Sequence, residues 1–196
     1  MHMKIKEKTD VTQNGRQKTN RVEAEAFFLR DMVKSDIPEI LALQEQILRE
    51  GDFDHQWFYP FSEEELKELV DEKNGIFIGA FAGDRLVAFR AGCFSGEEYD
   101  EITGALGSPY TETACFLMNG VFVHKDYRGH HLQQTLTEEC MKRCEEIGIN
   151  TFLSVTHPEN RASMTSLKNV GFVERSRQML FHGKYDRVIL VKEEIR

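Results

Sequence analysis

The pattern of apolar and polar positions from residue 26 onward predicts an alternation of short strands and amphipathic helices. Short apolar runs bounded by charged or turn residues are typical of buried strands, and apolar positions three and four residues apart are typical of one helix face. The predicted order, β-α-α-β-β-β-α-β-α-β-β, indicates one mixed α/β layer structure. Strands are expected over residues 26–33, 75–82, 85–94, 114–123, 151–155, 172–181 and 185–192, and helices over 35–48, 62–73, 132–147 and 159–171.

Several boundaries carry specific local signals. Pro38 falls in the first turn of the first helix, where a missing N–H does no harm. Ser62 and Glu65 have the spacing of a capping box at the start of the second helix. The Gly83-Asp84 pair predicts a hairpin turn, and Gly120 inside an apolar strand predicts a bulge or a close backbone approach. Residues 95–113 are predicted to form a loop.

Composition narrows the class of protein. A length of 196 residues fits one domain, and 25 Lys and Arg against 33 Asp and Glu give a formal charge of −8. The acidic balance argues against a nucleic-acid binder, and no apolar run approaches the length of a bilayer span, so neither nucleic acid nor a membrane is an expected partner. Four scattered cysteines are expected to be reduced thiols, which favours the cytoplasm.

The first 25 residues are polar and charged and contain no apolar segment of a secretory signal. We therefore expect an N-terminal tail over residues 1–25 and a single domain over residues 26–196. Length and composition leave the oligomeric state open between a monomer and a homodimer.

The segment VFVHKDYRGHHLQQTL, residues 121–136, is the most informative for chemistry. It is predicted to be a strand, a turn containing Arg128 and Gly129, and the start of a helix. Free N–H groups at a helix N-terminus and the positive end of the helix dipole form a site for an anion such as a pyrophosphate. Taken alone, the segment is equally compatible with an ordinary turn and a solvated arginine.

This turn resembles that of the GNAT superfamily of acetyl-CoA-dependent N-acetyltransferases, which commonly reads V-x-P-x-Y-R-G-x-G-x-G. The later segment HPENRASMTSLKNVGF, residues 157–172, is similar to the family's asparagine-containing helix that ends in Gly-Phe. The order of elements from residue 26 to the end is also similar. The resemblance implies an α/β fold with a mixed, mostly antiparallel sheet flanked by about four helices, acetyl-CoA as cosubstrate, and an N-acetyltransferase activity without a metal.

The resemblance also implies which residues hold the cofactor. Main-chain N–H groups of the turn would bind the pyrophosphate, the strand before it would pair with the pantetheine arm, and an asparagine on the later helix would face the arm. These residues are Val121, Phe122, Val123, Arg128, Gly129, His130, His131, Leu132, Gln133, Gln134 and Asn160.

Three positions depart from the family pattern. His131 and Gln133 stand where the family usually has its second and third loop glycines, and Leu167 stands where many relatives have a tyrosine that protonates the departing thiolate. A thiolate leaves readily, whereas an alkylamine must lose a proton before it attacks, so the base matters more than the acid. The candidates are Asn119, as the residue that orients a water, and Glu98, as a base acting through that water.

The expected reaction is direct attack of a neutral amine on the thioester, with the oxyanion held by a main-chain N–H near Val121. The acceptor is an unidentified small-molecule or peptide amine. The aromatic stretch over residues 49–61 is interpreted either as core or as a wall of the acceptor pocket. The acidic run over residues 97–101 is interpreted as a solvated loop unless it faces the thioester.

Three other interpretations concern parts of the same sequence. His124, His130 and His131 with Cys140 and Cys144 suggest a metal site, but their spacing fits no standard zinc pattern, and the cysteines continue the apolar helix face. A catalytically silent CoA-binding protein of the same fold is the main alternative function. A protein-interaction domain that uses the aromatic stretch is another.

Overall fold

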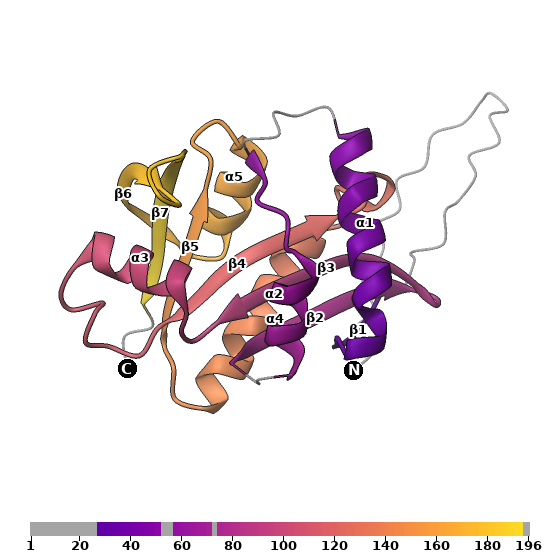
Figure 1. The fold of residues 1–196 in the computed structure, drawn as a ribbon, viewed down its shortest axis with the longest axis horizontal. Coiled ribbons are helices and arrows are strands. Elements are labelled where there is room, and N and C mark those ends of the chain that lie inside the picture. Colours follow the sequence, from indigo (N-terminus) through magenta and orange to yellow (C-terminus); the bar gives the residue numbers. More distant parts are fainter. Residues whose placement is uncertain (1–26, 52–56, 72–73, 194–196) are drawn as a thin grey trace, which may run out of the picture.

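A computed structural model describes residues 27–51, 57–71 and 74–193 of the chain. Seven strands form one sheet in the order β1-β2-β3-β4-β5-β7-β6, and every neighbouring pair is antiparallel except β4 and β5. Figure 1 shows the sheet running through the molecule with helices on both of its sides. The strands are β1 (Phe27–Asp31), β2 (Gly75–Ala82), β3 (Arg85–Cys93), β4 (Phe116–Val123), β5 (Thr151–Thr156), β6 (Val173–Leu180) and β7 (Tyr185–Glu193), and the helices are α1 (Ile37–Glu50), α2 (Glu63–Asp71), α3 (Glu97–Leu106), α4 (Leu132–Glu146) and α5 (Arg161–Asn169).

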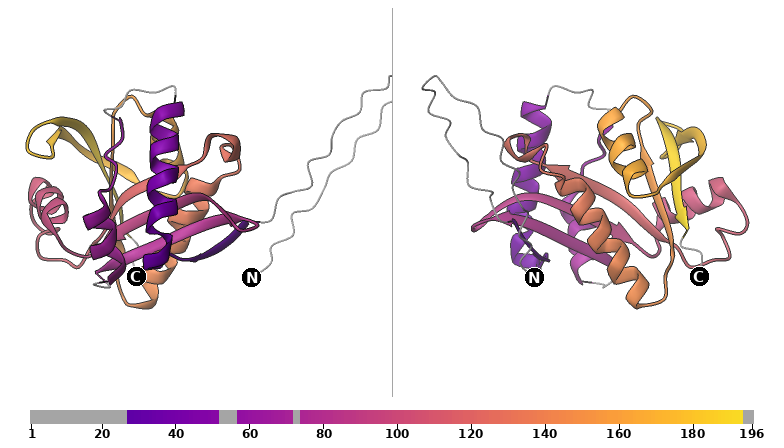
Figure 2. Two further views of the ribbon diagram at one scale, coloured as in Figure 1. Left: turned by 45° about the vertical axis from the view of Figure 1, so that its right-hand side comes forward. Right: turned by 180° about the vertical axis from the view of Figure 1, so that it is seen from behind.

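The helices pack on the sheet through three apolar clusters. On one face, α4 and α5 contact the strands through residues such as Leu136, Cys140 and Leu167, all essentially buried. On the other face, α1 and α2 cover β2 to β4, and α3 covers the end of the sheet formed by β5, β7 and β6. The right-hand view of Figure 2 shows α4 and α5 in front of the sheet, whereas α1 and α2 lie in front of it in Figure 1.

The sheet opens between its two parallel strands. Pairing of β4 with β5 is confined to residues 116–118 and 152–154, and beyond Met118 the two strands diverge, as Figure 1 shows. The register of β3 against β4 shifts between Ala91 and Cys93, which face Gly120 and Leu117, so β4 contains one extra residue there. Because a bulge bends its strand, this extra residue accompanies the divergence of β4 from β5.

Gly120 follows this bulge and also makes a close approach. A β-carbon at this position would come within 2.6 Å of the Phe61 ring. Both interpretations of the isolated strand glycine are therefore confirmed, since a bulge and a tight contact lie side by side.

Most predicted elements are confirmed. Ser62 N–H donates to Glu65 Oε2 at 2.6 Å and Glu65 N–H donates to Ser62 Oγ at 3.2 Å, which is the capping box expected before α2. Pro38 lies in the first turn of α1, and the hairpin of β2 and β3 turns at Gly83, whose φ is +59°.

The prediction of a loop over residues 95–113 is wrong. Residues 97–106 form α3, so five α-helices of the described ranges flank the sheet where about four were expected. Tyr99, Ile102 and Leu106 have helical spacing and pack into the apolar cluster beneath α3, but Gly104 and the acidic start obscured that pattern. Ile147, expected on the buried face of α4, is 63% exposed because the helix ends at Glu146.

The predicted N-terminal tail and the residue at which the domain begins lie outside the described residues. Within the described ranges, no helix has the length and apolar character needed to span a bilayer.

Candidate active site

A cavity of about 390 Å³ occupies the opening between β4 and β5. Its lining comes from β4, the turn after β4, the start of α4, the start of α5 and the end of β5, and from the aromatic segment before α2. Ile47 of α1, Glu98 and Ile102 of α3, and Phe181 and Arg187 of the β6–β7 hairpin also line it. The cavity thus extends from the positive end of a helix dipole to a partly buried carboxylate.

The turn that leads from β4 into α4 has the geometry of an anion site. Gly129 and His131 both have positive φ, +82° and +59°, and the first bond of α4 runs from Thr135 N–H to the His131 carbonyl at 2.9 Å. The main-chain N–H groups that precede Thr135 in the helix have no intrahelical acceptor, because the first four of any helix lack one. A turn that alternates positive and negative φ also directs successive N–H groups toward one side.

His131 stands where the GNAT pattern has a glycine and has a positive φ. It adopts the left-handed conformation that glycine favours, at a cost of about 1 kcal/mol for a residue with a β-carbon. The side chain is exposed. His131 thus adopts the backbone conformation that a glycine at this position would favour.

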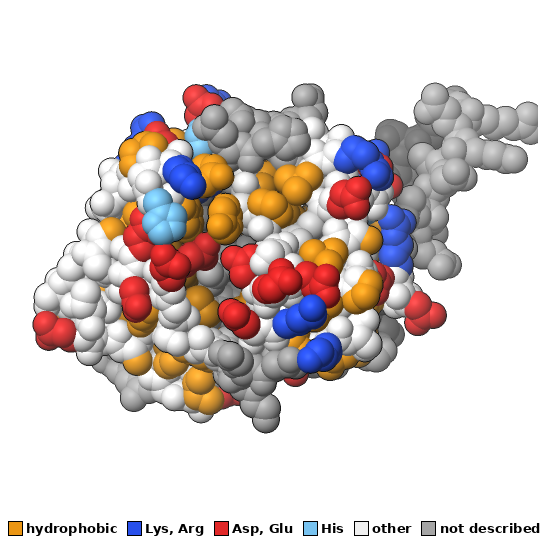
Figure 3. All heavy atoms as spheres, viewed as in Figure 1, with side chains coloured by type: hydrophobic (Ala, Val, Ile, Leu, Met, Phe, Trp, Pro, Cys, Tyr) orange, Lys and Arg blue, Asp and Glu red, His pale blue; other side chains and the backbone are white. Residues whose placement is uncertain are grey.

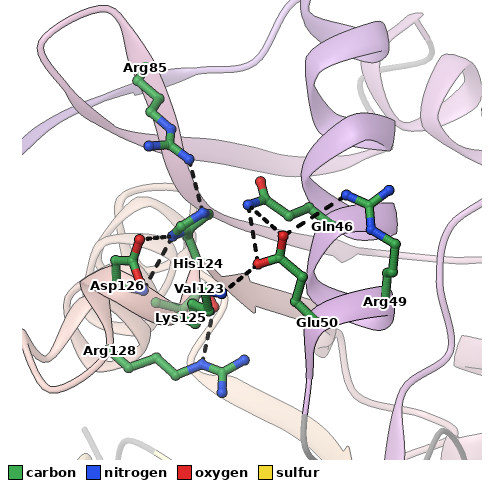
Figure 4. Close-up of polar contacts among 9 residues, drawn as sticks. All are labelled: Gln46, Arg49, Glu50, Arg85, Val123, His124, Lys125, Asp126 and Arg128. Atoms are coloured by element: carbon green, nitrogen blue, oxygen red, sulfur yellow. Dashed lines mark hydrogen bonds and ion pairs between the residues drawn. The ribbon is translucent and has the colours of Figure 1, made fainter.

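A polar network fixes the turn against α1 and β3 (Figure 4). Lys125 Nζ pairs with Glu50 at the end of α1 at 2.8 Å, and Arg85 Nη2 lies 2.9 Å from Nε2 of the buried His124. The Asp126 N–H donates to Nδ1 of the same imidazole at 3.2 Å. Burial, followed by the charge of Arg85, lowers the pKa of His124, so this histidine is neutral at physiological pH. His124 is thus a buried support of the turn.

Arg128 lies in the turn between β4 and α4 and is held by the strand before it. Its Nε donates to the Val123 carbonyl at 3.4 Å, and the residue lines the cavity. The guanidinium therefore adds positive charge beside the N-terminus of α4, as expected from the sequence.

Nine of the eleven predicted cofactor residues line the cavity, and two do not. The exceptions are His130, whose ring packs edge-on against Phe27 at 5.7 Å, and Gln134, whose amide donates to Glu138 at 3.0 Å. The side chains of these two residues are thus engaged elsewhere. The nine are Val121, Phe122, Val123, Arg128, Gly129, His131, Leu132, Gln133 and Asn160.

Asn160 and Gln133 join the starts of α4 and α5. The Asn160 side chain accepts a hydrogen bond from Ser163 N–H at 3.1 Å and so caps α5, and Gln133 Nε2 donates to Ser163 Oγ at 3.3 Å. The glutamine that replaces the family's third loop glycine thus connects the two helices. Asn160 uses its side-chain oxygen for this cap, and Asn160 still lines the cavity.

The two predicted catalytic residues contact each other directly. Asn119 Nδ2 donates to Glu98 Oε2 at 2.6 Å, and Asn119 Oδ1 accepts from the Cys93 thiol at 3.2 Å. Both Glu98 and Asn119 line the cavity. Because the thiol occupies the amide oxygen, the amide nitrogen is oriented toward the carboxylate.

Burial is the main cause that raises the pKa of Glu98 above its usual range. The hydrogen bond from Asn119 opposes this shift, and the neighbouring carboxylates of Glu65, Glu101 and Glu97 add to it. A carboxylate with a raised pKa is a better base toward an ammonium group. Figure 3 shows acidic side chains gathered over α2 and α3 on this face, in keeping with the acidic first turns of both helices.

The aromatic segment before α2 is both core and cavity wall. The interpretation as core is confirmed for part of residues 49–61, whereas a role as a wall of the acceptor pocket stays a prediction. Phe61 and Phe58 pack with Phe122, while Tyr59 stacks on Phe181 at 5.5 Å with the rings nearly parallel. Trp57 stacks on His157 at 6.0 Å. Residues 52–56 of this stretch lie outside the described residues.

Sequence reasoning missed the contribution of the β6–β7 hairpin. Phe181 and Arg187 line the cavity although they are distant in sequence from every motif. The one available signal is an arginine inside the apolar strand YDRVILVK, where a charge needs a reason to be buried.

The remaining residues singled out from the sequence, Leu167, Cys140 and Cys144, belong to the hydrophobic core. Leu167 is 1% exposed within the core beneath α4 and is absent from the cavity lining, and Cys140 and Cys144 are fully buried in the same core. Burial raises the pKa of each of these two thiols to about 12. Among the described residues, no group of three or more His, Cys, Asp or Glu side chains has the arrangement of a metal site.

Comparisons with known proteins agree with this geometry. A sequence model of the acetyltransferase (GNAT) family matches residues 40–172, and a search of curated protein sequences finds no match. Similar solved structures include the ribosomal-protein-S18-alanine N-acetyltransferase from Escherichia coli, with 15% identity, coverage of 85% of this chain and 93% of that one, and a TM-score of 0.62.

Two further structures of the same fold contain the cofactor. The PaiA N-acetyltransferase from Thermoplasma acidophilum, in complex with coenzyme A, has 16% identity, covers 86% and 99% of the two chains and gives a TM-score of 0.63. A phosphinothricin acetyltransferase from Sinorhizobium meliloti, in complex with acetyl-CoA, has 15% identity, coverage of 85% and 88% and a TM-score of 0.63. The family match spans most of the chain and includes the β4–α4 turn, and the chain therefore belongs to the GNAT acetyltransferase family and is an acyltransferase.

Proposed function

We propose that the protein transfers an acetyl group from acetyl-CoA to a primary amine by direct attack of the amine on the thioester. The observation that carries this proposal is the continuous cavity that reaches from the anion-binding turn at Gly129 to the Glu98–Asn119 pair. A cofactor bound along β4 would present its thioester near that pair. The four free, buried cysteines favour a reducing compartment, and we place the reaction in the cytoplasm.

The cofactor is assigned to the opening between β4 and β5. The main-chain N–H groups of residues 129–134 would hold the pyrophosphate, and Arg128 would pair with its charge. The unpaired side of β4 at residues 121–123 would bond to the pantetheine arm as an added strand does. His130 and Gln134 would contribute through their main chain alone, because their side chains bond elsewhere.

In the proposed step, the amine lone pair attacks the thioester carbon and forms the C–N bond. The oxyanion is stabilised by a main-chain N–H near Val121. Collapse breaks the C–S bond and leaves its electron pair on sulfur, and a thiolate departs readily because thiols titrate near pKa ~8.5. The proton lost from nitrogen passes to Glu98 through a water held by Asn119. Burial raises the pKa of Cys93 to about 12, so this nearby thiol stays protonated and is not assigned as a nucleophile.

The cofactor site is tested by calorimetry with acetyl-CoA and Arg128→Ala. Loss of one charge-assisted contact of about 1.5–3 kcal/mol predicts affinity weaker by roughly tenfold to a hundredfold. The control is Arg161→Ala, which removes an exposed arginine from the first turn of α5, outside the cavity lining. Equal affinities of the wild type and the Arg128 variant would show that the pyrophosphate binds elsewhere.

The base is tested through the pH dependence of kcat/KM. Glu98 must be ionised to accept a proton, so activity rises as the pH increases through its pKa, which lies above the usual value for glutamate. Glu98→Gln should lower kcat/KM by about 10²–10⁴-fold and remove this limb of the profile. Glu101→Gln is the matched control, because loss of that carboxylate lowers the pKa of Glu98 and moves the limb to lower pH while the maximum stays high.

A catalytically silent CoA-binding protein is the alternative that the buried Leu167 favours, since that position supplies no acid. Tight binding of acetyl-CoA without release of free thiol across a broad panel of amines would support this alternative and refute the proposed transfer.

A further inference from the structure

Three polar side chains form a hydrogen-bonded chain from β3 through β4 to α3 beside the cavity. The Cys93 thiol donates to Asn119 Oδ1 at 3.2 Å, and Asn119 Nδ2 donates to Glu98 Oε2 at 2.6 Å. Asn119 and Glu98 line the cavity, whereas Cys93 is 7% exposed and is not among the described lining residues. The thiol can therefore influence a group in the cavity only through Asn119.

The bulge in β4 brings these side chains together. Two residues of β4, Met118 and Asn119, lie opposite the single residue Gly92 of β3. Cys93 follows Gly92 and packs in the apolar cluster beneath α3, and Glu98 lies in the first turn of that helix. The Asn119 amide thus lies between a thiol of the sheet and a carboxylate of the helix that covers it.

The thiol determines which way the Asn119 amide is turned. Burial is the main cause that raises the pKa of Cys93 to about 12, and the charge of Glu98 adds to it, so the sulfur keeps its proton at neutral pH. A protonated thiol donates a hydrogen bond, and only the oxygen of an amide side chain accepts one. The amide nitrogen therefore faces the carboxylate, to which it can only donate.

The surroundings of Glu98 oppose its ionised form. Burial and three neighbouring carboxylates raise its pKa, and the hydrogen bond from Asn119 opposes this effect. Two further titratable groups interact with this carboxylate and are neutral at pH 7, because the pKa of each is raised. The five groups are Glu65 of α2, Glu97 and Glu101 of α3, the Cys93 thiol of β3 and the Tyr59 hydroxyl of the aromatic segment.

A fixed amide favours the ionised carboxylate over the protonated one. A protonated Glu98 is itself a donor and would bond best to the amide oxygen, which requires Asn119 to turn round. The thiol opposes that turn, because the reversed amide would present a nitrogen donor to the S–H donor. With the amide fixed, protonation replaces a charge-assisted hydrogen bond by a weaker one between uncharged groups.

We propose that Cys93 is a positioning residue, which holds the Asn119 amide with its nitrogen toward Glu98 and thereby keeps this carboxylate ionised and able to accept a proton at neutral pH. This inference rests on the proposed function, in which Glu98 is the base. Cys93 keeps its own proton throughout and takes no part in the bond changes.

The test follows the limb of the kcat/KM profile that rises with pH. Cys93→Ala removes the donor, so the amide can turn when Glu98 takes up a proton, and the midpoint of the limb should move upward by about one pH unit. Below the midpoint, this shift lowers kcat/KM about tenfold, while the maximum at high pH stays near that of the wild type. Cys93→Ser keeps a donor in the same place and should leave the midpoint near that of the wild type.

Cys115→Ala is the matched control, because it removes a buried thiol from the same apolar cluster. The Cys115 thiol donates to the Thr113 carbonyl at 3.3 Å, so its loss changes the packing beneath α3 and leaves the bond between Cys93 and Asn119 in place. The midpoint in the control should equal that of the wild type. An unmoved midpoint in Cys93→Ala, or an equal movement in Cys93→Ser or in the control, would overturn the proposal.

Carbon-13 NMR separates this proposal from the proposed function. The titration of the Glu98 carboxyl, identified as the signal that Glu98→Gln removes, is followed without any substrate in protein labelled at the glutamate carboxyl carbons. A midpoint that rises in Cys93→Ala but not in Cys93→Ser supports the positioning role even if no amine is acetylated, in which case the proposed transfer alone fails. An active wild type whose Glu98 titrates as it does in both variants overturns the positioning role alone.

Discussion

Arg90 provides a direct test of how burial and hydrogen bonding set the stability of this fold. It lies in the middle of β3, opposite Val121 of β4, and is 1% exposed. Within the described residues, its Nε and Nη2 atoms are buried and have no hydrogen-bond acceptor. Burial lowers the pKa of Arg90 to about 10, so the side chain remains charged at pH 7 in spite of its surroundings.

The expected change in the free energy of unfolding can be worked from the shifted pKa and, separately, from the unsatisfied hydrogen-bond donors. Lowering the pKa of Arg90 from the ordinary value of arginine to about 10 corresponds to roughly 3 kcal/mol against the charged form. Two unsatisfied buried donors cost about 1–3 kcal/mol each. Arg90→Met keeps an unbranched side chain of similar length and removes both penalties. The free energy of unfolding should therefore rise by about 2–3 kcal/mol, which corresponds to roughly 4–12 °C in Tm for a domain of this size.

The assay is urea unfolding at pH 7, followed by circular dichroism, with the m-value used to confirm that the same surface is exposed. Arg49→Met is the control, because the Arg49 side chain is 66% exposed and its ion pairs are at the surface, so its effect should stay within about 0.5 kcal/mol. A lower free energy of unfolding for Arg90→Met, at an unchanged m-value, would show that the guanidinium is satisfied and refute the reasoning.

The pH dependence gives a second signature of the same residue. Because the folded pKa lies below the unfolded one, the unfolded chain binds more protons from about pH 10 up to the unfolded pKa, and stability relative to the variant rises with pH in that window. The difference between wild type and Arg90→Met should therefore shrink above pH 10. A difference that is constant across this range would contradict the assignment of the penalty to the charge.

Two further predictions concern substitutions that remove or introduce a glycine. Gly120→Ala should lower the free energy of unfolding by about 1–3 kcal/mol, because its β-carbon would lie 2.6 Å from a carbon of the packed Phe61 ring. The control is Gly104→Ala in α3, which has open space around it and should raise the free energy of unfolding by up to about 1 kcal/mol. Equal effects of the two substitutions in denaturant unfolding would contradict the steric account. His131→Gly should raise stability by about 0.5–1 kcal/mol, because glycine accepts the positive φ without strain. A thermal shift to lower temperature in that variant would show instead that the His131 side chain makes a stabilising contact.

Local signals in the sequence were sufficient for most elements and for the turn between β4 and α4. The capping box at Ser62 and Glu65, the hairpin turn at Gly83 and the turn at Gly129 each depend on interactions between residues a few positions apart, and such interactions are readable from one segment. The order of strands and helices, apart from α3, follows from the same periodicities.

The helix α3 was misread for a physical reason. Its acidic first turn and Gly104 are typical of a solvated loop, and its apolar side has meaning only when the sheet beneath it is present. Glu98 was singled out from the acidic run, but its position beside Asn119 depends on where α3 packs on the sheet. Packing of α3 on the sheet therefore determines both that residues 97–106 are helical and that Glu98 contacts Asn119.

The residue pattern by itself determined most of the strands and helices, the turn between β4 and α4 and the resemblance to the GNAT family, because these depend on signals within short stretches of chain. Only the folded molecule determined which distant groups share one cavity. Glu98 precedes the cofactor turn in the sequence, whereas Phe181 and Arg187 follow it on a separate hairpin, and no local rule links the three. Their charges and rings meet because β4 and β5 diverge, and that divergence results from pairing across the whole sheet.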